Sequence, residues 1–138
     1  MAQSIRELMT SNPCSIESDK SVAYAAKMMR DENVGLAPIV EGDRLVGTVT
    51  DRDVTIRVVA EGKDPESTKV KEIASTDLVT VDPQQVLDEA LRLMAQHQVR
   101  RLPVVEEGGV LVGVVAQADI ARSADDSKTG ELVEEISK

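Results

Sequence analysis

The sequence predicts a mixed α/β protein made of two copies of one strand–helix–strand–strand–helix unit. Two observations lead to this prediction. The chain of 138 residues matches itself when it is shifted by 65 residues. In each copy, an apolar stripe with helical spacing is followed by two short apolar strands that flank a glycine-containing turn.

The internal match runs along most of both copies. One extra residue enters the turn of the second copy, after which the offset rises by one. Because apolar segments, glycines and acidic residues recur in the same order, both copies are expected to fold in the same way. The clearest corresponding segments are 5–8 and 70–73, 38–41 and 103–106, 45–47 and 111–113, and Asp53 and Asp119.

Each copy is expected to contain an amphipathic helix, because apolar residues recur at positions i, i+3, i+4 and i+7. For the second copy, Asp82 and Pro83 are expected to supply the N-cap and the first helical residue. The expected stripes are Val22, Ala25, Ala26 and Met29 in the first copy and Leu87, Ala90, Leu91 and Met94 in the second.

A hairpin and a second helix are expected to follow in each copy. Two such units packed face to face would bury their apolar surfaces in one shared core. The expected strands are 38–40, 45–49, 103–105 and 110–115, with second helices that begin near residues 51 and 117. The expected division is repeat 1 at 1–62, a linker at 63–69, repeat 2 at 70–123 and a tail at 124–138, where Leu132, Val133 and Ile136 indicate a short helix.

The composition argues against several classes of partner. With 16 basic and 25 acidic residues the net charge is −9, which disfavours nucleic acid and anionic membrane surfaces. Tyr24 is the sole Phe, Trp or Tyr residue, so stacking platforms for single-stranded nucleic acid are lacking. No apolar run approaches a membrane span and the N-terminus lacks a signal-peptide pattern, so a cytoplasmic protein is expected.

Three segments resemble the cystathionine-β-synthase (CBS) domain family. They are Val-Gly-Leu-Ala-Pro-Ile-Val at 34–40, Val-Arg-Arg-Leu-Pro-Val-Val at 99–105 and Gly-Thr-Val-Thr-Asp-Arg-Asp at 47–53. The resemblance covers nearly the whole chain and implies two βαββα CBS repeats with pseudo-two-fold symmetry, which together form one Bateman module. Thr-Asp-Arg-Asp followed by Ala-Glu-Gly-Lys-Asp-Pro at 60–65 is similar to the actinobacterial hypoxic response protein 1 group.

This resemblance also implies a function. CBS modules bind adenosine-containing ligands in clefts between their repeats and usually pair into disc-like homodimers. The implied ligand is AMP, ADP or ATP, with S-adenosylmethionine as a further candidate, and no cofactor is required. No catalytic domain is attached, so the module would regulate an unknown protein target in trans.

The family's ligand motif is glycine, two apolar residues, serine or threonine, two variable residues and aspartate. Repeat 1 matches it with Thr50 and Asp53, and departs from it at Thr48. The resemblance implies that the Asp53 carboxylate accepts hydrogen bonds from the ribose hydroxyls, which suits an acceptor-only group, and that Thr50 lies beside them. In repeat 2 Ala116 replaces the threonine, so Asp119 marks a weaker second site.

The resemblance further implies that basic residues before the proline of the opposite repeat reach the ligand's phosphates. Arg100 and Arg101 precede Pro103, so the Asp53 site has basic partners there. Arg52, beside the motif, is a weaker phosphate candidate. The implied adenine-pocket residues are Asn12, Pro13 and Cys14 on the first strand, and Val34 and Gly35 before the hairpin, where Gly35 has no side chain to block the cleft.

Simpler interpretations of the same residues stay open. Thr50 and Asp53 also fit a capping box at the start of a helix. The arginines at 100–101 can equally be solvated surface charges. His97 is expected late in a helix and Cys14 is expected to be a small buried residue, so neither a zinc site nor a catalytic group is expected.

Three functions are therefore weighed. The first is a dimeric sensor of adenine nucleotides that uses the Asp53 site. The second is a ligand-independent interaction protein or stress-response scaffold, in which the motif serves only as a helix cap. The third, an enzyme, is disfavoured because no nucleophile, metal set or base constellation is visible in the sequence.

Overall fold

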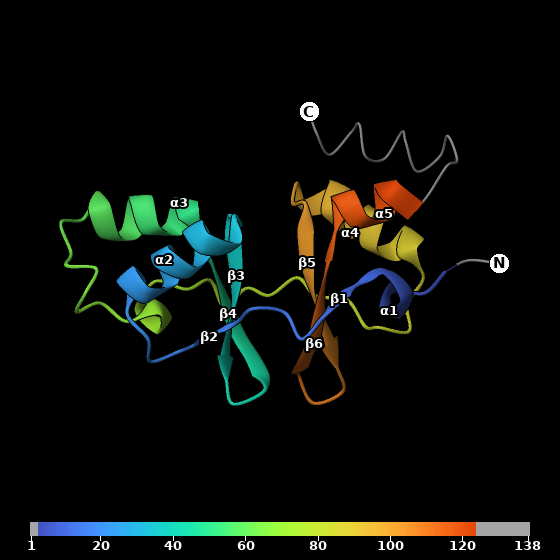
Figure 1. The fold of residues 1–138 in the computed structure, drawn as a ribbon, viewed down its shortest axis with the longest axis horizontal. Helices are drawn as coiled ribbons and strands as arrows, with labels where there is room; N and C mark the ends of the chain where they lie inside the picture. The colour runs from blue at the N-terminus through green and yellow to red at the C-terminus, as the bar shows by residue number, and fades with distance from the viewer. Residues whose placement is uncertain (1–2, 124–138) are drawn as a thin grey trace. The chain divides into compact units, whose positions relative to one another are not determined.

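The computed structural model describes residues 3–123, which form two compact units (Figure 1). The first-repeat unit contains residues 14–78, and the second-repeat unit combines residues 3–13 with 79–123. The tail at 124–138, with the helix expected around Leu132, Val133 and Ile136, lies outside the described residues. No helix within residues 3–123 is long and apolar enough to cross a membrane.

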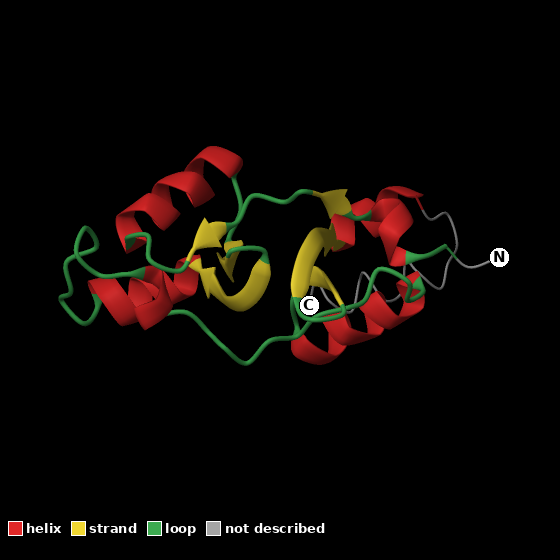
Figure 2. Ribbon diagram, turned by 90° about the horizontal axis from the view of Figure 1, so that it is seen from below, coloured by secondary structure: helices red, strands yellow, loops and turns green. Residues whose placement is uncertain are grey.

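The first-repeat unit is built on an antiparallel hairpin of β3 (Leu36–Glu41) and β4 (Arg44–Thr50). A short strand, β2 (Ile16–Glu17), pairs in parallel with β3. The helices of the unit pack against one face of these strands (Figure 2). They are α2 (Val22–Glu32), α3 (Asp51–Val54), the π-helix η1 (Thr55–Val59) and the 3₁₀ helix η2 (Val70–Glu72).

The second-repeat unit has the same plan, which confirms the predicted pair of repeats. An antiparallel hairpin joins β5 (Arg101–Glu106) to β6 (Val110–Ala116). The two-residue strand β1 (Thr10–Ser11) pairs with β6. The helices are α1 (Ile5–Leu8), α4 (Leu87–His97) and α5 (Gln117–Ser123).

The first long helix of each repeat buries three of the four residues of its predicted apolar stripe. In α2, Val22, Ala25 and Met29 are buried, while Ala26 is exposed. The Ser21 hydroxyl accepts a hydrogen bond from the backbone N–H of Tyr24 and so caps the helix. In α4 the buried stripe residues are Ala90, Leu91 and Met94.

The predicted N-cap at Asp82 is wrong, because α4 begins at Leu87 after an extended Val86. The Asp82 carboxylate instead accepts from the Gln84 N–H at 2.8 Å, which closes a separate turn before the helix. The backbone carbonyls of this turn bind α1, since the Pro83 carbonyl accepts from the Arg6 N–H. These contacts hold residues 82–86 outside the helix.

The prediction of one shared core is also wrong, because each unit has a hydrophobic cluster of its own. The first-repeat cluster is centred on Ile16, Ile39 and Val49, and the second-repeat cluster on Leu91 and Leu102. Each hairpin is covered by its own long helix and by a segment from the start of the other repeat. Each unit therefore excludes water from its own core.

The start of each repeat packs in the unit formed by the other repeat. We call these segments the N-terminal arm (3–11) and the middle arm (68–76). In Figure 1 the N-terminal arm, drawn in blue with α1 and β1, lies beside β6 and α4. The bridging pairs of the N-terminal arm are Ser4 with Val86 and Thr10 with Val114, and those of the middle arm are Lys69 with Ser21 and Ser75 with Thr48. The two arms thus pair with the opposite repeats at corresponding positions of the internal repeat.

The packing of the arms explains why the ligand motif of both repeats begins with glycine. A Cβ on Gly47 would lie 3.0 Å from the Ser75 carbonyl oxygen, and a Cβ on Gly113 would lie 2.9 Å from the Thr10 carbonyl oxygen. The contact at Gly113 is shorter than a Cβ tolerates, and the contact at Gly47 is tight enough that the middle arm would have to shift. Both positions therefore favour glycine where the arm crosses the strand.

Candidate functional site

The ligand motif of repeat 1 forms a complete capping box at the start of α3. The Asp53 N–H donates to Thr50 Oγ1 at 3.1 Å, and the Thr50 N–H donates to Asp53 Oδ2 at 2.9 Å. The predicted capping box of Thr50 and Asp53 is therefore present. It leaves the second carboxylate oxygen of Asp53 and the hydroxyl proton of Thr50 available to other partners.

The second carboxylate oxygen of Asp53 faces a basic side chain. Arg57 Nε lies 3.9 Å from Asp53 Oδ1, and Arg57 also donates to the Ile73 carbonyl in the middle arm at 3.2 Å. The Asp53 side chain is 17% exposed, so water reaches it only in part. The carboxylate predicted to bind ribose is therefore partly sheltered from solvent and linked to the middle arm through Arg57.

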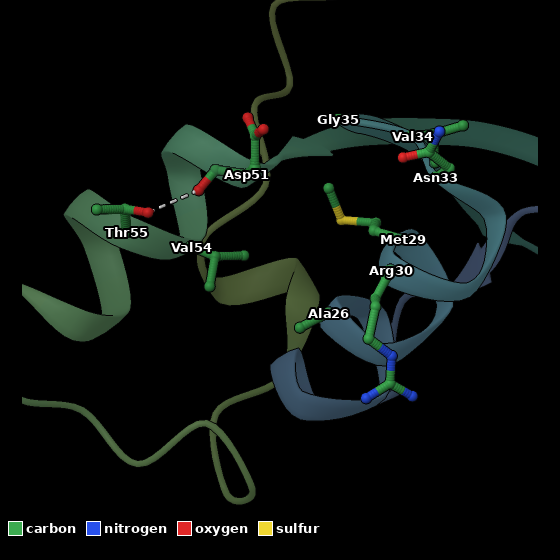
Figure 3. Close-up of a pocket in the computed structure, with 9 residues that line it drawn as sticks. All are labelled: Ala26, Met29, Arg30, Asn33, Val34, Gly35, Asp51, Val54 and Thr55. Carbon is green, nitrogen blue, oxygen red and sulfur yellow. Dashed lines mark hydrogen bonds between the residues drawn. The ribbon is translucent and has the colours of Figure 1, made fainter.

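A hollow of about 460 Å³ opens between α2 and α3 in the first-repeat unit (Figure 3). We call it the first hollow. Its floor is apolar and its rim is polar, as in many small-molecule sites, and its volume falls in their usual range. The floor residues are Ala26, Met29, Val34 and Val54; the remaining lining residues are Arg30, Asn33, Gly35, Asp51 and Thr55.

Asp51 and Gly35 meet at the rim of the first hollow. The Asp51 N–H donates to the Gly35 carbonyl at 3.0 Å, and Asp51 Oδ1 accepts from the Arg52 N–H at 2.8 Å. A Cβ on Gly35 would lie 3.2 Å from Asp51 Oδ2. The absence of a side chain at Gly35 thus keeps the hollow open beside this carboxylate.

An equivalent hollow of about 330 Å³ lies in the second-repeat unit, and we call it the second hollow. The Gln117 N–H donates to the Arg100 carbonyl at 2.8 Å, as Asp51 does to Gly35 in the first repeat. The two hollows therefore share three corresponding positions, namely Gly35 and Arg100, Asp51 and Gln117, and Thr55 and Ala121. The second is lined by Arg100, Arg101, Ala116, Gln117, Ala118 and Ala121.

The Asp119 carboxylate of the second motif forms an ion pair with Arg122, three residues later on α5. Ala116 offers no hydroxyl for the reciprocal cap, as the sequence indicated. Asp119 therefore has a cationic partner three residues later, whereas the cation that faces Asp53, Arg57, lies four residues later at 3.9 Å.

The structure divides the predicted site residues between the two units. Val34 and Gly35 line the first hollow, and Arg100 and Arg101 line the second. Thr50, Arg52 and Asp53 lie at the start of α3 but line neither hollow. Asn12 and Pro13 belong to the second-repeat unit, and Cys14 to the first.

The sequence placed residues 12–14 on a strand, and this placement is wrong. They lie between β1 and β2, because Asn12 has a left-handed backbone with φ of 51° that ends β1.

Asp51 and Thr55 line the first hollow but were not among the residues predicted from the sequence. The signal that could have found Asp51 was its place directly after the capped Thr50, at the helix end that faces Gly35.

Cys14 is exposed, so the expectation of a small buried residue is wrong. It lies on a connecting segment at the surface, where such segments usually run. Its Sγ donates to Glu32 Oε1 at 3.2 Å. This hydrogen bond, with smaller contributions from burial and from the negative charge of Glu32, raises the pKa of the Cys14 thiol.

A raised pKa leaves less thiolate at neutral pH, so Cys14 is expected to react slowly with iodoacetamide for an exposed thiol. Replacing Glu32 by glutamine removes the negative charge and should increase the alkylation rate at pH 7.5 by a few-fold. Asp31→Asn, on the same helix, serves as the control and should leave the rate unchanged. An unaltered rate in Glu32→Gln would contradict the assigned cause.

His97 is exposed and ends α4, which agrees with its predicted place late in a helix. Within residues 3–122, no group of three or more His, Cys, Asp or Glu side chains is arranged to hold a metal ion.

Comparison with known proteins identifies the family. The CBS domain model matches residues 5–60 and 70–126. The chain belongs to the CBS domain family. This CBS pair is 42% identical to the CBS domain-containing protein YhcV of Bacillus subtilis over 86% of this chain and 83% of that protein. It is 36% identical to hypoxic response protein 1 of Mycobacterium tuberculosis over 95% of this chain and 92% of that protein.

Solved structures share the fold of this CBS pair. Hypoxic response protein I, solved with two coordinated zinc ions, matches with a TM-score of 0.82 and 37% identity over 89% of this chain and 100% of that chain. The CBS domain pair of protein MJ0100, solved in complex with 5′-methylthioadenosine and S-adenosylmethionine, matches with a TM-score of 0.77 and 25% identity over 89% and 96% of the two chains. The predicted family and fold class are thereby confirmed.

Proposed function

We propose that this CBS pair is a non-catalytic sensor that binds an adenosine-containing ligand. The observation that carries the proposal is the first hollow, which has the volume, the apolar floor and the polar rim of a small-molecule site. Its position beside the capped motif of repeat 1 supports the same conclusion, as does the adenosine chemistry of the ligands bound by the related MJ0100 pair.

Each site residue is proposed to take one role. Asp53 Oδ1 accepts from the ribose hydroxyls, and Thr50 donates its hydroxyl proton beside it. Arg100 and Arg101 bind phosphate, which favours AMP, ADP or ATP as ligand, with S-adenosylmethionine as a further candidate. Arg52 is a weaker phosphate ligand and Asp119 a weaker second ribose site. Contacts to adenine are proposed for Asn12, Pro13, Cys14, Val34 and Gly35.

The sensor is proposed to act as a homodimer on a separate protein target. Exposed apolar side chains on α2 and η1 support an interface in the first-repeat unit, because large apolar side chains at a surface favour association. These residues are Tyr24, Ile56 and Val59.

The alternative function is ligand-independent binding of a protein partner. One observation favours it, namely that the Thr50–Asp53 capping box is complete without any ligand. In that case the motif would stabilise α3, and adenosine ligands would have no effect on partner capture.

A thermal-shift panel separates these two functions. The panel contains adenosine, 5′-methylthioadenosine, AMP, ADP, ATP and S-adenosylmethionine, with guanosine and GTP as controls. A ligand at about 100 times its Kd adds roughly 2.7 kcal/mol of stability, which raises the Tm by several degrees. We expect adenosine compounds alone to raise the Tm. A flat panel would contradict the sensor and favour the partner-binding function.

A further inference from the structure

We propose that Asp51 makes the first hollow selective for adenosine ligands that carry no phosphate group. The proposal rests on the sensor function for the adenosine part of the ligand, and it assigns the phosphate-bearing ligands, AMP, ADP and ATP, to the second hollow, which Arg100 and Arg101 line. Its own basis is the difference in charge between the two equivalent hollows. It assigns a role to Asp51, which lies outside the residues of the ligand motif.

The first hollow presents an uncompensated negative charge. Within residues 3–122, Asp51 forms no ion pair, and its Oδ1 accepts only a backbone N–H, from Arg52. Its Oδ2 points to the space that Gly35 leaves open. Arg30, the cationic lining residue, is itself paired with Asp31 at 3.0 Å. A phosphate group in this hollow would face the Asp51 carboxylate, while the lining cation Arg30 already has Asp31 as a partner.

The second hollow shows the opposite arrangement at the same positions. Arg100 replaces Gly35, and Gln117, a neutral amide, replaces Asp51. Neither Arg100 nor Arg101 forms an ion pair within the described part of the chain. Phosphate oxygens suit this pair of guanidinium groups. The two repeats therefore differ in the charge of the ligand that each hollow accepts.

The rest of the first hollow suits an uncharged nucleoside. The apolar floor of Ala26, Met29, Val34 and Val54 offers a surface for a planar base. A carboxylate at the rim accepts hydrogen bonds from an amino group or from hydroxyls, which adenosine carries and which make no like-charge contact. Repulsion between a phosphate dianion and a partly solvated carboxylate at close range weakens binding by about tenfold or more.

The test is a titration of the ¹⁵N-labelled full chain with adenosine, AMP or inorganic phosphate, followed by amide chemical shifts. The amides of Val34 and Gly35 report on the first hollow, and those of Arg100 and Arg101 on the second. In the wild type we expect adenosine to saturate the Gly35 shift with a Kd at least about tenfold below that of AMP. Inorganic phosphate should shift Arg100 and Arg101 but not Gly35.

Asp51→Asn keeps the size of the side chain and removes its charge. In this variant we expect the Kd of AMP at Gly35 to fall to within about threefold of that of adenosine, because the like-charge repulsion is gone. Asp43→Asn, which removes an exposed carboxylate from the turn between β3 and β4, should leave the ratio of the two Kd values at Gly35 unchanged.

Two results would overturn the assignment of Asp51 and leave the sensor function intact. One is a wild type in which AMP binds at Gly35 as tightly as adenosine, and the other is an Asp51→Asn variant with an unchanged ratio. Failure of both adenosine and AMP to shift any amide saturably would instead overturn the sensor function, and the selectivity with it.

Discussion

Replacing Asp53 by alanine is expected to weaken adenosine binding by about 10- to 100-fold, the usual effect of losing hydrogen bonds to a charged group. Asp53 Oδ1 is the motif's carboxylate oxygen that accepts no backbone hydrogen bond, so it is the atom proposed to hold the ribose hydroxyls. The equivalent Asp119 is paired with Arg122 and lacks a neighbouring threonine. Asp119→Ala should therefore change the Kd much less, as measured by isothermal titration calorimetry.

Asp53 also caps α3, so the alanine variant is expected to lose about 0.5–2 kcal/mol of stability as well. Asp53→Asn separates the two effects, because an amide oxygen can still accept from the Thr50 N–H while the negative charge is lost. Urea denaturation should show Asp53→Asn close to the wild type in stability, while its Kd for adenosine is raised. Equal Kd values for the Asp53 and Asp119 variants would contradict the assigned site.

Gly113→Ala is expected to destabilise the protein by about 1–3 kcal/mol, because an added methyl group is forced against packed atoms. The Cβ would lie 2.9 Å from the Thr10 carbonyl oxygen, which belongs to the backbone of the N-terminal arm and cannot rotate away. Gly113 is also paired with Ser11 of β1, so a shift of the arm would break that pairing. The free energy of unfolding in urea measures this loss directly.

Gly35→Ala is the matched control for this prediction. Its Cβ would meet Asp51 Oδ2 at 3.2 Å, and a side-chain oxygen can move by a few tenths of an ångström. The loss of stability should therefore be smaller than for Gly113→Ala. If both variants unfold at the same urea concentration as the wild type, the N-terminal arm does not pack against β6 as closely as described.

The repeated plan of the fold could be predicted from the sequence because it depends on local patterns. Apolar periodicity predicts the helical stripes at Val22–Met29 and Leu87–Met94. The turn glycines predict the two hairpins. The exchange of arms could not be predicted in this way. It depends on backbone pairing between distant residues, such as Thr10 with Val114, and such pairing leaves no periodic signal.

The same contrast applies to the candidate site. The spacing of Thr50 and Asp53 predicted both a capping box and a ligand motif, and the structure contains the capping box. The sequence could not place Asp51 at the rim of the first hollow, because that depends on how closely α3 approaches the turn before β3. The exposure of Cys14 was missed for a similar reason, since burial on an irregular segment follows from tertiary packing and not from residue type.

The most direct test of the sensor function is calorimetric titration of the full chain with adenosine and with AMP, using guanosine as the control. We expect saturable heat for at least one of the two adenosine compounds, a Kd that rises in Asp53→Asn, and no saturable heat for guanosine. Absence of saturable heat for both adenosine compounds up to millimolar concentration would contradict the central claim. The Thr50–Asp53 motif would then be a helix cap alone.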